Sequence, residues 1–144
     1  MAVSQLVADL QVIFTNTTPQ AFWDALHFQR RVQTQAALQG YSSDDIFVTG
    51  HSLGGWEAEF VAQQDQLGGI GFESPGLNTK KAGNGRNSGG FVNVETYGDP
   101  AAYMATDLPG LQLHAEVRAG RGGSKPHYGS IVMIGDPQGR LPAD

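Results

Sequence analysis

The 144-residue chain has no cysteine, few basic residues and no long apolar run. The absence of cysteine excludes disulfides, thiolate nucleophiles and thiolate metal sites, and it leaves the redox compartment open. Nine lysines and arginines against fourteen acidic residues give a net charge of −5. This charge argues against a nucleic-acid partner, because phosphate neutralisation needs clustered basic side chains. No stretch approaches the roughly 18 uninterrupted apolar residues of a membrane span.

The first fourteen residues, MAVSQLVADLQVIF, lack the features of a secretory signal. They have no basic start, they carry Asp9 within the apolar part, and no clear small-residue cleavage site follows. The compartment therefore stays open between cytoplasmic and secreted, with the cytoplasm as the default. The length and the apolar fraction of 40% are typical of one globular domain. We expect residues 1–144 to form a single domain.

Apolar runs that alternate with helical patterns predict an α/β fold. We expect helices over residues 19–40 and 54–67, and a polar, glycine-rich loop over residues 78–90. The predicted strands are residues 45–49, 68–74, 91–96, 111–118 and 130–135. The first and last of these are expected to be buried, and residues 111–118 alternate as a half-exposed strand does. A strand, helix, strand order predicts a mostly parallel sheet with flanking helices.

The pentapeptide GHSLG at residues 50–54 points most directly to chemistry. It matches the nucleophile elbow, a strained strand-to-helix turn that raises a serine hydroxyl above a sheet edge. In a glycine-rich chain the pentapeptide alone also fits a small residue in a tight turn. The predicted strand before it and the helix after it favour the elbow, with Ser52 as nucleophile. We expect glycine at 50 and 54 because a Cβ there would collide with neighbouring backbone. The Leu53 N–H, at the helix start, would bind an oxyanion.

A serine nucleophile needs a histidine base and an orienting carboxylate, which in this type of fold follow in the order Ser, Asp or Glu, His. Asp99 follows the predicted strand at 91–96 and is the predicted acid, although an Asp-Pro turn residue is an alternative role. His127, in the loop before the last predicted strand, is the predicted base. Weaker alternatives are His114 for the base, and Asp107 and Asp136 for the acid.

Other kinds of site fit the sequence poorly, and we expect no cofactor. No two histidines stand at helical ligand spacing and no carboxylate run suits calcium, so we expect no metal. Residues 82–90 lack the Lys-Ser or Lys-Thr of a phosphate loop. The loop at 78–90 lacks the amphipathic face of an interfacial lid, which favours soluble or short-chain esters over lipid surfaces. Aromatic side chains of the first helix are expected to lie in the core, namely Phe22, Trp23 and Phe28.

Three segments, VTGHSLGG, GFESPGLN and VNVETYGDPAAYM, together resemble the lipase class 3 group of α/β-hydrolases, whose members cleave acylglycerols and related esters. The resemblance covers roughly residues 5–135. It implies a partial α/β-hydrolase fold and hydrolysis of carboxylic esters through an acyl-enzyme. In that family's pattern Ser52 corresponds to the nucleophile, Asp99 to the acid and His127 to the final histidine. The implied partner is a small-molecule or lipid ester substrate.

The resemblance also predicts a gap. Members of the family carry, upstream of an Asp-Leu segment similar to Asp9-Leu10, a strand ending in an Arg-Gly-Thr-like turn that donates the second oxyanion N–H. A missing donor costs about 3 kcal/mol, unless residues 15–18 supply it. We expect the domain to lack the early strands and to leave a sheet edge exposed. Either self-association covers this edge, or the chain is a fragment or domain of a longer hydrolase. The alternative function is a non-catalytic, degenerate hydrolase-fold module used for binding or assembly.

Overall fold

The computed structural model describes residues 20–77, 90–99, 101–102, 105 and 126–138. Its elements are helix α2 (Gln20–Leu38), the short 3-10 helix η1 (Ser43–Asp45), strand β1 (Phe47–His51), helix α3 (Leu53–Asp65), and strands β2 (Gly68–Phe72), β3 (Phe91–Thr96) and β4 (Ser130–Ile134). The predicted α/β class is confirmed. Predictions that lie outside the described residues are the strand at 111–118, nearly all of the loop at 78–90, His114 and Asp107.

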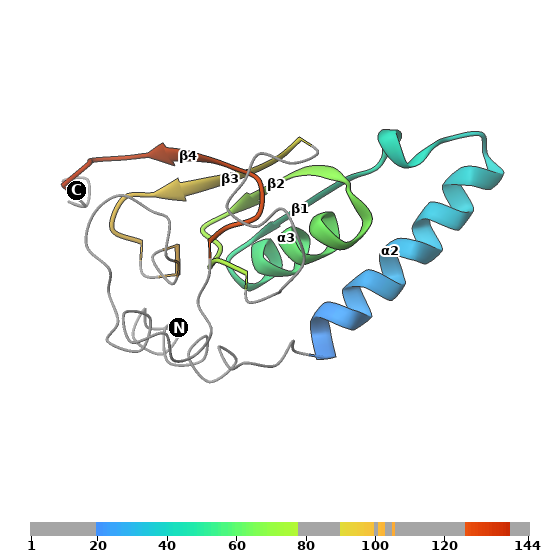
Figure 1. Cartoon of the computed structure of the whole chain (residues 1–144), viewed down its shortest axis with the longest axis horizontal. Coiled ribbons are helices and arrows are strands. Elements are labelled where there is room, and N and C mark those ends of the chain that lie inside the picture. Colours follow the sequence, from blue (N-terminus) through green and yellow to red (C-terminus); the bar gives the residue numbers. More distant parts are fainter. Residues whose placement is uncertain (1–19, 78–89, 100, 103–104, 106–125, 139–144) are drawn as a thin grey trace.

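The four strands form one parallel sheet in the order β1-β2-β3-β4 (Figure 1). Gly50 of β1 pairs with Gly71 of β2, and Val94 of β3 pairs with Val132 of β4. Helix α3 connects β1 to β2 as the crossover that a parallel pair requires. Because the strands are parallel, the residues that follow each of them gather at one edge of the sheet. Ser52 and Glu73 lie at this carboxyl edge.

The two long helices form successive layers on one face of the sheet (Figure 1). Helix α3 packs on β1 and β2, and α2 packs on α3. The contact between the helices is aromatic: the rings of Phe22 and Trp56 meet edge to face at 5.0 Å, and those of Trp23 and Phe60 at 5.3 Å. The core prediction is confirmed for Phe22 and wrong for Trp23 and Phe28, which are 39% and 61% exposed.

The start of β1 differs from the sequence-based prediction, which placed the strand at 45–49. Residues 43–45 instead form a single 3-10 turn closed by a capping box. The Asp45 carboxylate accepts from the Ser42 N–H at 2.9 Å, and the Ser42 hydroxyl accepts from the Asp44 N–H at 3.3 Å. Because Asp45 serves this turn, the strand begins at Phe47 and runs through His51.

The prediction that β1 and β4 are buried strands is wrong. Along each of them exposed residues alternate with half-buried ones. Both are edge strands of the described sheet, and the described helices cover only one of its faces. The uncovered face exposes a row of apolar side chains, each between 38% and 74% exposed: Phe47, Ile70, Phe72, Val132 and Ile134. Parallel sheets are normally covered on both faces, so this surface is unusually apolar.

If the chain self-associates, we expect the contact to form at the outer edge of β1 and on the sheet face that the described helices leave uncovered. We expect sedimentation velocity to show concentration-dependent dimers or larger species, and Phe47→Lys to shift them towards monomer, because a buried ammonium at the contact is costly. Leu38→Lys is the matched control, since Leu38 is equally exposed but lies at the end of α2. A strict monomer at high concentration would contradict the expectation.

Candidate active site

Ser52 occupies a strained backbone conformation between the last residue of β1 and the first residue of α3. Its φ of 55° and ψ of −117° lie in a region that side chains other than glycine rarely adopt. The neighbouring elements hold it there. The Ser52 N–H donates to the Phe72 carbonyl at 2.8 Å, and the Ser52 carbonyl accepts from the Trp56 N–H at 3.0 Å. The turn therefore has the backbone geometry of a nucleophile elbow.

Two glycines permit this turn, and one of them is not the glycine that the motif predicts. A Cβ on Gly50 would stand 2.1 Å from the Gly54 carbonyl oxygen, which confirms the steric role of Gly50. At Gly54 a Cβ would meet nothing within 4 Å, so the predicted collision there is wrong. Gly55 has that role instead, because its Cβ would lie 2.9 Å from the Phe72 carbonyl oxygen. Helix α3 turns the Gly54 Cα outwards and the Gly55 Cα towards β2.

The Ser52 hydroxyl and the Leu53 amide have the surroundings that a nucleophile and an oxyanion donor would need. The Ser52 Oγ atom is buried and has no hydrogen-bond partner in the described structure. Leu53 is the first residue of α3, where backbone N–H groups lack intrahelical acceptors. The predicted second donor at residues 15–18 lies outside the described residues. The catalytic roles of Ser52 and Leu53 stay predictions.

Asp99 lies three residues beyond β3, at the same sheet edge as Ser52. Its backbone N–H donates to the Thr96 carbonyl at 3.1 Å. Its Oδ1 atom accepts from the N–H groups of Ala101 at 2.9 Å and Ala102 at 3.0 Å. Asp99 thus closes the turn after β3, which is the alternative role that its Asp-Pro sequence suggested.

His127 is completely buried beside the segment that follows β2. Its Nε2 atom lies 2.5 Å from the Ser74 carbonyl oxygen and 3.4 Å from Glu95 Oε1. Since Ser52 Oγ has no hydrogen-bond partner, the Ser52–His127 bond of an assembled triad is not formed. Ser74 itself lies close to the first turn of α3, since a Cβ on Gly55 would stand 3.1 Å from the Ser74 Cβ.

A buried polar layer beneath β3 is the feature that the sequence-based reading missed. Asn93 and Glu95 are fully buried on the face of β3 that the helices cover. The Ser74 hydroxyl lies 3.2 Å from Asn93 Oδ1 and 3.3 Å from Glu95 Oε1. From α3, Glu59 Oε1 accepts from the Tyr128 N–H at 2.6 Å. The pKa of Glu95 is raised to about 9, mainly by burial and in addition by the nearby Glu73 carboxylate.

The sequence does contain signals for this layer, although charged side chains are usually expected on the surface. In FVNVET the period of two places Phe91 on the same face as Asn93 and Glu95, so one buried aromatic side chain identifies the inward face. In α3, Glu59 lies between Trp56 and Phe60 at helical spacing. The positions of the aromatic residues, and not the polarity of the glutamates, therefore indicate that Glu95 and Glu59 face the interior.

Glu73 joins the carboxyl ends of β2 and β3. Its φ of 53° is also positive, and its carboxylate accepts from the Thr96 N–H at 2.9 Å and from the Thr96 hydroxyl. Asp136, the weaker candidate acid, follows β4 and accepts from the Gln138 N–H at 2.8 Å. Within the described ranges no group of three or more His, Asp or Glu side chains could hold a metal ion.

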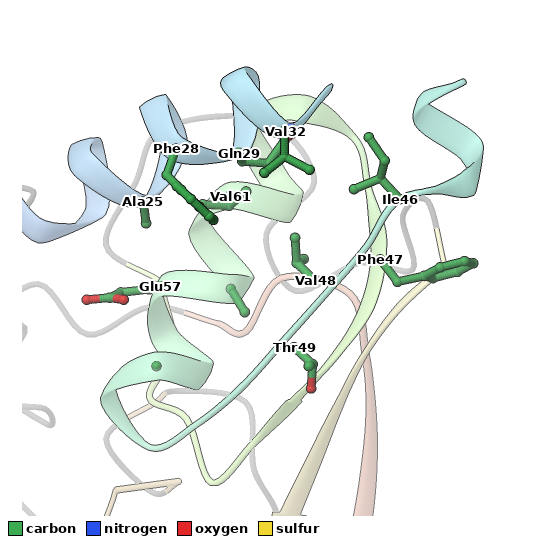
Figure 2. A pocket seen from close by; sticks show the side chains of 12 residues that line it. Ala25, Phe28, Gln29, Val32, Ile46, Phe47, Val48, Thr49, Glu57 and Val61 are labelled. Carbon is green, nitrogen blue, oxygen red and sulfur yellow. The ribbon is translucent and has the colours of Figure 1, made fainter. Parts of the chain in front are cut away.

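An apolar groove of about 360 Å³ runs between α2, α3 and the open edge of β1. Figure 2 shows Phe28 and Val32 of α2 facing Val48 of β1 across it. Its lining residues are Ala25, Phe28, Gln29, Val32, Ile46, Phe47, Val48, Thr49, Gly54, Glu57, Ala58 and Val61. Gly54 belongs to the elbow, and Glu57, whose pKa is raised by burial, is the only ionisable residue in the lining.

Comparisons with protein-family models, with curated proteins and with solved structures found no match. The resemblance to class 3 lipases therefore remains a prediction from the quoted motifs. None of the described helices has the length and apolar character needed to cross a membrane.

The two glycines of the elbow give a direct test of its steric basis. Gly50→Ala should lower the free energy of unfolding by about 3 kcal/mol, because its Cβ would overlap the Gly54 carbonyl. Gly54→Ala should be neutral or stabilise by about 0.5 kcal/mol, because a helical alanine replaces a glycine in open space. Urea unfolding of both variants measures the difference, and equal effects would refute the packing described for this turn.

Proposed function

We propose that the chain is a serine carboxylic-ester hydrolase with Ser52 as its nucleophile. The observation that carries the proposal is the conformation of Ser52, held at positive φ between a parallel strand and a helix N-terminus. Such strain costs on the order of 1–3 kcal/mol and concentrates at functional sites. A serine that only fills a turn has no need of it, since a glycine would adopt the same backbone without strain.

The chemistry follows from the groups around the elbow. Ser52 Oγ attacks the acyl carbonyl carbon and passes its proton to His127, while the Leu53 N–H binds the oxyanion. The imidazolium then protonates the departing alcohol, which leaves an acyl-enzyme. Water repeats the sequence and releases the acid and the free serine. A carboxyl group orients the imidazole, and Asp99 is the residue that the sequence nominates for this role.

The absence of a Ser52–His127 hydrogen bond is compatible with this mechanism. Catalytic hydrogen bonds are often long or misaligned before substrate binds and shorten only in the reactive complex. Ser74 lies close to the first turn of α3, and its carbonyl oxygen contacts His127.

The groove beside β1 offers a site for the acyl part of the substrate. Its lining is mostly apolar, and it includes Gly54, two residues beyond the nucleophile. Apolar clefts that contain few polar groups are typical small-molecule sites. The groove supports a hydrolase of esters with modest acyl chains, in keeping with the polar loop predicted at 78–90.

A non-catalytic module is the second candidate, and one observation favours it. The His127 ring is fully buried and engaged with Ser74 and Glu95, as a structural histidine would be. In that case the elbow would be a retained packing feature, and the chain would serve binding or assembly.

A fluorophosphonate probe separates the two candidates. We expect covalent labelling of the wild type and its complete loss in Ser52→Ala, because the probe reacts only with an activated serine hydroxyl. Ser42→Ala is the control, since Ser42 only caps an exposed turn. Folded wild type that does not label would favour the non-catalytic module.

Chain-length preference tests the groove. Ala25→Leu adds bulk to the lining and should lower kcat/KM for octanoyl p-nitrophenyl esters at least tenfold relative to the acetyl ester, because the longer chain would lose its space. Ala37→Leu makes the same change on an exposed part of α2 outside this groove and should leave the ratio unaltered. An unchanged ratio in Ala25→Leu would place the acyl chain elsewhere.

A further inference from the structure

Glu73 shares with Ser52 a backbone conformation that residues other than glycine rarely adopt. Within the described ranges three such residues have a positive φ, namely Ser52 at 55°, Gln66 at 57° and Glu73 at 53°. Gln66 is the left-handed cap that commonly ends a helix, here α3. Ser52 and Glu73 do not end a helix, so the strain at these two positions has another cause.

The two strained residues follow neighbouring strands at the carboxyl edge of the sheet. His51 of β1 pairs with Phe72 of β2, and Ser52 and Glu73 are the next residues of the two segments. They are joined by the peptide group between Phe72 and Glu73. Its carbonyl accepts from the Ser52 N–H at 2.8 Å, and its N–H donates to the Val94 carbonyl of β3 at 3.0 Å. The backbone of the proposed nucleophile therefore depends on where this peptide group lies.

The side chain of Glu73 fixes the same peptide group to β3. Its carboxylate accepts from the Thr96 N–H at 2.9 Å and from the Thr96 hydroxyl. Hydrogen bonds from a backbone N–H to a carboxylate are stronger than those between neutral groups. A strained backbone persists only where surrounding bonds determine it, and the bonds to Val94 and Thr96 do this for Glu73.

The Phe72 carbonyl also determines how closely α3 approaches the sheet. A Cβ on Gly55 would stand 2.9 Å from this oxygen, so the first turn of α3 packs directly against it. Leu53, whose amide is the predicted oxyanion donor, belongs to that turn. A displacement of the Phe72 carbonyl would therefore disturb both the serine and the oxyanion donor.

We propose that Glu73 is a positioning residue for the nucleophile, because its bonds to Thr96 hold the Phe72 carbonyl where it fixes the Ser52 backbone. The inference rests on the proposed hydrolase function, which gives Ser52 its reaction. In this role Glu73 acts through the Phe72 carbonyl and transfers no proton. The strain at residues 52 and 73 then has one common purpose, which is to hold the serine hydroxyl in its reactive position.

Two substitutions at Glu73 separate its hydrogen bonds from its charge, with p-nitrophenyl acetate as substrate and the full chain as enzyme. Glu73→Gln loses the charge but keeps an oxygen for the Thr96 N–H, so kcat should stay within about threefold of the wild type. Glu73→Met has a similar length and no such oxygen, so kcat should fall at least about tenfold with KM within about threefold. A Glu73→Met variant with the wild-type kcat would overturn the inference.

Asp45→Ala shows whether lost stability alone could lower kcat. Asp45 accepts from the Ser42 N–H at 2.9 Å in the turn before β1, whereas the elbow follows the other end of this strand. Its loss should lower Tm, as Glu73→Met also does, but leave kcat per folded molecule within about twofold of the wild type. An equal fall of kcat in the two variants would assign both effects to stability and refute the positioning role.

Amide hydrogen exchange provides a readout that does not depend on turnover. In Glu73→Met the Ser52 N–H should exchange at least about tenfold faster than in the wild type, because its acceptor is no longer held. The Leu67 N–H, which donates to the Ala62 carbonyl at 3.1 Å beyond the end of α3, should keep its rate. An unchanged rate at Ser52, or an equal increase at both amides, would contradict the inference.

Glu73→Gly decides the matter if Glu73→Met does not fold. Glycine adopts a φ of 53° without strain and also lacks the carboxylate, so this variant keeps the turn but loses the bonds to Thr96. It should show the same fall in kcat and the same faster exchange at Ser52. Wild-type values for both quantities would overturn the role of Glu73.

Failure of the inference can be told apart from failure of the proposed function. Wild type that labels with the fluorophosphonate probe at Ser52, together with a Glu73→Met variant that labels at the same rate, would overturn only the role of Glu73. Absence of Ser52-dependent labelling in folded wild type would overturn the hydrolase function, and the catalytic purpose of Glu73 would fall with it.

Discussion

The close approach of α3 to the ends of β1 and β2 is the constraint on which the candidate site depends. Gly50 and Gly55 bring backbone against backbone at this point, where a Cβ would stand 2.1 Å and 2.9 Å from carbonyl oxygens. The bond from the Ser52 N–H to the Phe72 carbonyl then holds the turn in a conformation that a free chain avoids. The direction of α3, the surroundings of the serine hydroxyl and the contact with Ser74 all follow from this packing.

A buried polar layer lies between β3 and the segment before β4. Parallel sheets usually cover such a face with apolar side chains, yet here Asn93, Glu95 and Ser74 are fully buried and joined to His127. Such a layer needs partners for its polar atoms, because an unpaired buried polar group costs more than a hydrogen bond contributes. Glu95 Oε1 has such partners, whereas Glu95 Oε2 has none in the described structure. The layer fixes one arrangement of the 126–128 segment, since Glu59 of α3 binds the Tyr128 N–H.

The fold was largely predictable from the sequence because its signals are local. The α/β class, the two helices and strands β2, β3 and β4 follow from apolar runs and helical spacing that lie within each segment. The start of β1 was not predictable in this way, because Asp45 caps a 3-10 turn instead of beginning the strand. The burial of β1 and β4 was misjudged because burial depends on what covers a face, and a run such as DIFVT carries no information on that.

The candidate site was predictable only in part. The elbow could be identified because strand, glycine, serine and helix are contiguous. The environment of His127 could not, since Ser74 and Glu95 lie 53 and 32 residues away and meet it only through the folding of the segment before β4. Order along the chain predicts a carboxylate after β3, but it does not show that one of its oxygens already closes a turn, as Oδ1 of Asp99 does.

Ser52 has one consequence for the evolution of stability in this chain. A glycine in its place would adopt the same φ of 55° without penalty, so the serine makes the folded state less stable than the same backbone would otherwise allow. Thermal selection alone would favour replacing it. A variant library sorted for heat tolerance should accumulate glycine at this position, whereas one sorted for turnover should keep serine. A difference between the two libraries would show that the strained conformation is kept for activity and not for stability.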